Sequence, residues 1–260
     1  MNHMNTEFRY RMIIAIIIVL TQLSVALGQG ATRSPSDTVR EFYKAMREKR
    51  FREAFALSIY KPAVEGLKPE EFEDLRPDFE AMAAAIPEKV ELTGEQISGE
   101  AATVFVKVKD TESGGQAEPV SLIRLDGTWI IGDRENQNIV TRAGKNFFFN
   151  ARIDTHHQEV QNMFQRISLA QVVYSQQHGG QFGDLPGLIT AGLLPKDLEG
   201  TQTTGYRFRI MLSADRKSWT AAAEPAQYGR TGKLSFFMDK TGVKSGDEGG
   251  KPVPTSPIAP

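Results

Sequence analysis

Apolar residues change from helical to strand spacing once in each half of this chain, and this feature constrains the fold most. In each half they first recur three or four residues apart, as on one face of a helix, and then alternate as in a strand. A helix and a strand with one apolar face each must bury that face against another element. Both halves therefore predict helices packed on an antiparallel sheet, which gives an α+β fold with two domains.

The length supports this division, because 260 residues exceed a usual domain of roughly 100–150 residues. The first domain is expected to have helices on a curved sheet, and the second to have one long helix on a small antiparallel sheet. The predicted boundaries are 1–28 for a signal peptide, 33–140 for the first domain, 141–150 for a linker, 151–250 for the second domain and 251–260 for a proline-rich disordered tail.

The N-terminus has the pattern of an export signal. Arg9 and Arg11 precede a long apolar run, and small residues follow that run. Cleavage after Gly28 is one interpretation, and an uncleaved membrane anchor over 12–27 is the other. Both predict an exported chain that is periplasmic or extracellular.

Charge and cysteine content exclude several classes of protein. The 31 basic and 32 acidic residues nearly cancel, so a broad field for nucleic acid is absent and membrane contact is expected only through an uncleaved anchor. The chain has no cysteine, which excludes disulfides, thiolate metal sites and a cysteine nucleophile.

The first domain is predicted as helices followed by strands. Pro35 and Pro69 stand where two helices begin, a position that suits proline. Pro77 lies inside the second of these patterns, which predicts a kink or a division there. Strand alternation is clear from Ala102, and Asp126-Gly127 is typical of a tight hairpin turn.

This order of elements resembles the nuclear transport factor 2-like superfamily, which has a cystatin-like cone fold. The resemblance is carried by the helix from Val39 to Met46, the pair Ala54-Phe55, and the ending Leu-Asp-Gly-Thr-Trp-Ile-Ile over 125–131. It implies a pocket between the sheet and the helices. In enzymes of the superfamily it also implies an acid/base pair in that pocket.

A pocket in the first domain is expected to bind a small apolar ligand or a peptide. Histidine is absent from this domain, so a catalytic base would be a carboxylate such as Asp133, with Tyr43 or Tyr60 as hydrogen-bond donor. The alternative is that Asp133 is a solvated strand end and Tyr43 a core residue. The candidate pocket residues are Tyr43, Tyr60, Phe105, Trp129 and Asp133.

The second half contains the longest helical pattern, from Val160 to Tyr174, which ends at Gly179-Gly180. Three or four strands are expected after a short helix at Leu185. This half resembles the headpiece of type IV pilins and type II secretion pseudopilins, although it lacks their N-terminal hydrophobic helix. The matching segments are 170–174, 180–185, 192–194, 205–208, 223–225, 228–232, 235–239 and 242–243.

The second resemblance implies contacts with envelope or secretion-system proteins and, in some pseudopilins, a calcium ion. The weak calcium candidates are Asp239, Asp247 and Glu248, whose spacing lacks the dense carboxylates of an EF-hand, so a plain turn is the alternative. His156 and His157 are adjacent, and neighbouring helical residues point about 100° apart, which disfavours a shared metal. No cofactor is expected.

These observations predict an exported, non-enzymatic binding protein of the cell envelope, linked to secretion or pilus-type assembly. The alternative is a small-molecule-binding protein or isomerase-like enzyme that uses a pocket in the first domain.

Overall fold

A computed structural model describes residues 33–88, 90–108, 117–201 and 204–254. The predicted signal peptide, the anchor alternative and the last six residues of the predicted tail lie outside these ranges. The chain forms two compact units that divide after Phe147. Each unit combines helices with one four-stranded antiparallel sheet, so the predicted α+β fold is confirmed.

Short helices dominate the start of the first unit. Ser34 caps the first of them, because its hydroxyl accepts a hydrogen bond from the Asp37 amide and Pro35 occupies the first turn. The helices of this unit are α2 (Pro35–Arg47), α3 (Phe51–Ala56), α4 (Lys61–Glu65), α5 (Pro69–Ala84), α6 (Arg134–Ala143) and the 3₁₀ helix η1 (Gly144–Asn146).

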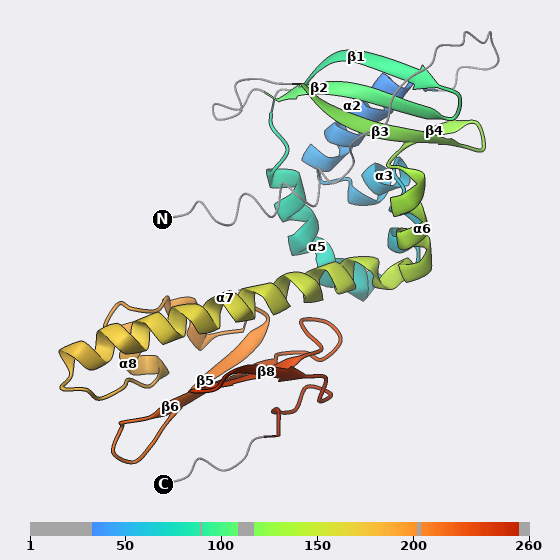
Figure 1. Cartoon of the computed structure of the whole chain (residues 1–260). Helices are drawn as coiled ribbons and strands as arrows, with labels where there is room; N and C mark the ends of the chain where they lie inside the picture. Colours follow the sequence, from blue (N-terminus) through green and yellow to red (C-terminus); the bar gives the residue numbers. More distant parts are fainter. Residues whose placement is uncertain (1–32, 89, 109–116, 202–203, 255–260) are drawn as a thin grey trace. The chain divides into compact units, whose positions relative to one another are not determined.

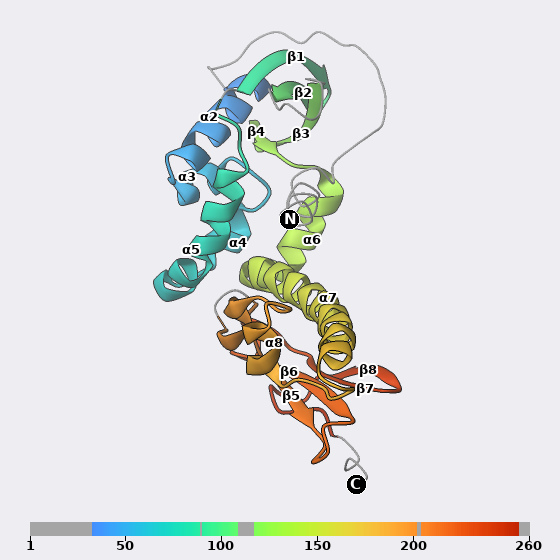
Figure 2. The same cartoon turned by 90° about the vertical axis from the view of Figure 1, so that its left-hand side faces the viewer.

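The sheet of the first unit follows chain order. Its strands are β1 (Val90–Ser98), β2 (Ala101–Val108), β3 (Ala117–Leu125) and β4 (Thr128–Ile131), and they pair in the order β1-β2-β3-β4. The sheet is curved, and α2 lies across one of its faces (Figures 1 and 2). The Asp126-Gly127 turn joins β3 to β4, and both residues have positive φ, as the sequence predicts.

Two groups of apolar residues fill the first unit. One lies between α2 and the sheet. The other lies among α2, α3 and α5, where the centroid of the Phe79 ring is 5.7 Å from that of Phe51 and 4.9 Å from that of Phe55. The buried residues between α2 and the sheet are Val39, Ala102, Val104, Val106, Leu122 and Trp129.

Of the kink or division predicted at Pro77, the division does not occur, because α5 runs through this residue. Proline inside a helix removes one hydrogen bond and costs about 3 kcal/mol. The helix is nevertheless retained because buried residues lie on both sides of the proline, at Phe72, Leu75 and Phe79. Tertiary packing therefore outweighs the local preference.

The second unit is one long helix on a sheet. Its elements are α7 (Phe147–Gln177), α8 (Leu185–Thr190), the 3₁₀ helix η2 (Lys196–Glu199), β5 (Tyr206–Leu212), β6 (Trp219–Pro225), β7 (Ser235–Asp239) and β8 (Gly242–Gly246). The strands pair antiparallel in the order β5-β6-β7-β8. The residues predicted as the linker 141–150 form the end of α6, all of η1 and the start of α7.

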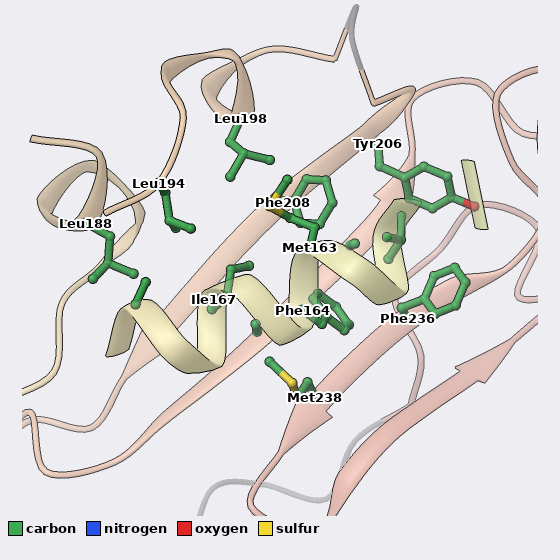
Figure 3. Packing of buried hydrophobic residues seen from close by; sticks show 14 residues of the cluster. Met163, Phe164, Ile167, Leu188, Leu194, Leu198, Tyr206, Phe208, Phe236 and Met238 are labelled. Carbon is green, nitrogen blue, oxygen red and sulfur yellow. The ribbon is translucent and has the colours of Figure 1, made fainter. Parts of the chain in front are cut away.

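The core of the second unit lies between α7 and the sheet (Figure 3). Phe164 of α7 is fully buried, and its ring meets those of Phe208 and Phe236 edge-on at 6.2 and 6.4 Å. Leu188 and Leu198 close the core from α8 and η2. Among the described residues, α7 and every other helix lack a stretch long and apolar enough to cross a bilayer.

Candidate functional site

The structure does not bring the predicted pocket residues to one place. Trp129 is buried on the face of the sheet that α2 covers, and Tyr43 packs against the same cluster. Phe105 alternates with the buried Val104 and Val106 and therefore lies on the opposite face of the sheet. A single pocket cannot be lined by both Trp129 and Phe105.

Tyr60 and Asp133 do lie near each other. Tyr60 precedes α4, and its ring packs against those of Phe55 and Phe147 with centroids 6.2 and 5.3 Å away. Burial raises the pKa of the Tyr60 hydroxyl, and the negative charge of Asp133 raises it further. The phenol therefore remains protonated over the physiological range.

Asp133 is the N-cap of α6. Its Oδ1 accepts the Asn136 amide at 2.8 Å, and its Oδ2 accepts the Asn136 side-chain amide at 2.7 Å. Both oxygens are thus used in starting the helix. This geometry gives Asp133 a structural role and agrees with neither a free base nor a fully solvated strand end.

Replacing Asp133 tests this role. Asp133→Ala is expected to lower the stability of the first unit by about 1 kcal/mol, whereas Asp133→Asn keeps most of it, because asparagine caps a helix as well as aspartate does. Urea unfolding followed by the fluorescence of Trp129, in a Trp219→Phe background, measures the difference. Equal losses of stability in Asp133→Ala and Asp133→Asn would show that the carboxylate charge stabilises the first unit and the cap hydrogen bond does not.

The calcium candidates are also separated. Asp239 accepts hydrogen bonds from the Thr241 hydroxyl and, at 2.7 Å, from the Thr241 amide in the turn between β7 and β8, and these bonds lower the pKa of its carboxyl. Asp247 accepts the Tyr228 hydroxyl at 2.8 Å just after β8 and lies, with Glu248, at the other end of the same hairpin. The described part of the chain contains no cluster of three residues that could hold a metal.

A groove of about 620 Å³ lies between α3 and α5, which the sequence did not indicate. Arg52 lies over the Phe72 ring at 4.1 Å and forms part of its wall. The other cationic side chains that line the groove are paired with carboxylates. Arg76 pairs with Glu73, and Lys49 pairs with Glu80 at 3.1 Å. Arg50 contacts three carboxylates, those of Glu41, Glu48 and Glu53. The groove thus offers a ligand little uncompensated charge.

The outward side of α7 is a more unusual surface than this groove, because it exposes aliphatic side chains. Leu169, Val172 and Val173 are 69%, 53% and 37% exposed and lie on adjacent turns, which we call the aliphatic patch. They point away from Phe164 and Ile167, which face the sheet. The apolar spacing that predicts this helix identifies only the residues on its buried side, so it does not reveal the aliphatic patch.

Uncharged residues continue the aliphatic patch along the helix. Gln158, Asn162, Gln165 and Gln176 share its direction at helical spacing, and all are exposed. Over 158–176, a length of about 27 Å at the helical rise of 1.5 Å per residue, these positions are all uncharged, and the exposed Arg166 and the half-buried Glu159 border them. We call these seven residues the neutral face.

Comparisons with known proteins do not identify a family for this chain. The sequence matches no protein-family model and no curated protein. The chain is similar to a solved structure from Campylobacter jejuni described as an NTF2-like transpeptidase, with 16% identity over 37% of this chain and 95% of that one, and a TM-score of 0.27. That description agrees with the resemblance of the first half, but similarity at this level identifies neither a fold nor an activity. The pilin-like resemblance has no support from these comparisons.

Proposed function

We propose that this chain is an exported, non-enzymatic binding protein of the cell envelope that contacts a protein partner through the neutral face of α7. The aliphatic patch is the observation that carries the proposal. A helix on the surface of a domain usually turns charged residues to solvent. This chain has ample charge, with 24% of its residues charged, yet the seven residues of this face are all uncharged and Arg166 lies at its border.

The composition of the neutral face matches the centre of protein interfaces. Interface centres are depleted of charged side chains, because burying an unpaired charge is costly. Burial of an exposed aliphatic side chain such as Leu169 contributes about 1.5–3 kcal/mol. Neighbouring amides can form hydrogen bonds to a partner without that desolvation cost. The face is therefore suited to a protein rather than to an ionic ligand.

The identity of the partner is a further part of the proposal. Envelope or secretion-system proteins are the partners that the sequence resemblance of the second half implies. Neither the alternative pocket in the first domain nor an isomerase-like site gains support from the positions of Tyr43, Phe105 and Trp129.

Site-specific crosslinking tests the proposal. A photoreactive residue at Val173 of the full chain, in the organism that makes it, is expected to yield a discrete adduct. The same residue at Lys240, an exposed position in the β7–β8 turn, is expected to yield none. Adding Leu169→Glu should reduce the Val173 adduct about tenfold, because a charge enters the buried centre of the contact.

The matched control is Gln181→Glu, which adds the same charge at an exposed position beyond the end of α7. It should leave the adduct intact. Adducts of equal yield at Val173 and Lys240, or a yield that Leu169→Glu does not change, would refute the neutral face as the binding surface.

A further inference from the structure

Two histidines of α7 hold the segment between β6 and β7, which we call the β6–β7 segment. His156 Nδ1 lies 2.7 Å from the backbone oxygen of Thr231. His157 Nε2 lies 3.3 Å from the backbone nitrogens of both Lys233 and Leu234. Neighbouring residues of one helix thus bond to successive parts of one connection.

The partners of these bonds determine where the protons lie. A carbonyl oxygen only accepts, so His156 must carry a proton on Nδ1, as it does in its Nδ1-protonated neutral tautomer and in its charged form. A backbone N–H only donates, so His157 must have no proton on Nε2 and must be neutral. Protonation therefore leaves the His156 bond intact and abolishes both His157 bonds.

The ring of His157 rests on the core of the second unit. Its centroid lies 6.3 Å from that of Tyr206 and 5.7 Å from that of Phe236, two fully buried rings that it meets edge-on. These neighbours are apolar around the imidazole. They favour the neutral form, because a charged ring would lose hydration without gaining a counter-ion from them.

Some of the groups around His157 lower its pKa, and one raises it. Burial lowers its pKa below the ordinary value of 6.5, and the positive charges of His156 and Lys233 lower it further. The carboxylate of Asp154, one turn earlier in α7, opposes these effects. From β5, Tyr206 contributes no charge, because burial raises the pKa of its own hydroxyl.

We propose that protonation of His157 is a switch that releases the β6–β7 segment from α7 at Lys233 and Leu234, while His156 keeps Thr231 attached. The imidazolium would direct an N–H at two backbone N–H groups and must turn away from them. The released part is Lys233, which is exposed, and the amide side of Leu234, whose oxygen still accepts the Tyr206 hydroxyl at 2.8 Å. Acid therefore changes the surface that this part of the second unit presents.

The direction of the pH effect follows from the lowered pKa. The unfolded chain takes up a proton at His157 at higher pH than the folded chain does. The contribution of His157 to stability is complete above about pH 6.5 and declines as the pH falls below that value. Release within the folded state follows at a lower pH, once the pH reaches the pKa of the folded protein.

Hydrogen exchange of the full chain, measured by NMR at pH 7.5 and pH 5.0, tests the switch. Protection factors remove the intrinsic pH dependence of exchange. Those of the Lys233 and Leu234 amides are expected to fall about tenfold at the lower pH, as expected when one ordinary hydrogen bond per amide is lost. His157→Gln should remove this dependence, because its side-chain oxygen accepts an N–H and does not titrate.

His156→Gln is the matched control and should keep the pH dependence of the two amides. The chemical shift of the His157 ring in the unsubstituted chain provides a second reading that needs no variant. A ring that stays neutral down to pH 5.0 would overturn the proposal. Protection of both amides that does not change with pH, or a His157→Gln variant that behaves as the unsubstituted chain does, would overturn it as well.

Discussion

Replacing Gly232 by alanine is expected to destabilise the second unit by about 3 kcal/mol, the upper end of the usual cost of overpacking a core. A Cβ at this position would overlap the Tyr206 hydroxyl and lie 2.5 and 2.7 Å from two of its ring carbons. Tyr206 cannot move aside, because it is fully buried, packs on Phe236 and donates its hydroxyl to the Leu234 oxygen at 2.8 Å.

Hydrogen exchange of the amides in β5, β6 and β7 measures this loss for the second unit alone. The matched control is Gly200→Ala, whose Cβ would meet nothing closer than 3.8 Å, and its stability should stay within about 0.5 kcal/mol of the unsubstituted chain. A Gly232→Ala variant as stable as the Gly200→Ala variant would show that Tyr206 does not occupy this position.

Gln171→Leu is expected to lower the stability of the second unit by about 2–4 kcal/mol, because it leaves two buried backbone groups without partners. Gln171 is fully buried in α7. Its amide donates to the Gly183 oxygen at 2.6 Å, and its oxygen accepts the Gly183 amide at 2.9 Å. Leucine has nearly the same size, so the loss reports the hydrogen bonds and not a cavity.

Two variants separate the possible causes. Gln165→Leu makes the same change on the exposed side of α7 and should alter stability by less than about 0.5 kcal/mol. Gln171→Glu would bury a carboxylate against the Gly183 oxygen, so a loss at least as large as that of Gln171→Leu is expected at pH 7, and it should become smaller at low pH, where the protonated acid can both accept and donate. Urea unfolding followed by Trp219, in a Trp129→Phe background, measures all three. Equal stability of Gln171→Leu and Gln165→Leu would contradict the role of these bonds.

Local sequence signals predicted most elements but missed α6. Only Val140 of this helix is buried, so its sequence has no apolar stripe to recognise. The cap at Asp133 was the available signal, and its position after a strand favoured the interpretation of a strand end. The start of α7 was missed for a related reason, since three adjacent phenylalanines have no helical period.

The sequence by itself determined the α+β class and the two-unit organisation, because periodicity, proline positions and turn residues act over a few neighbouring residues. It also determined the Asp126-Gly127 turn and the buried side of α7. Only the tertiary structure decided which face of β2 carries Phe105, how His157 meets the β6–β7 segment, and that the neutral face of α7 is left exposed. Those outcomes depend on contacts between residues far apart in the chain, for which a single sequence carries no periodic signal.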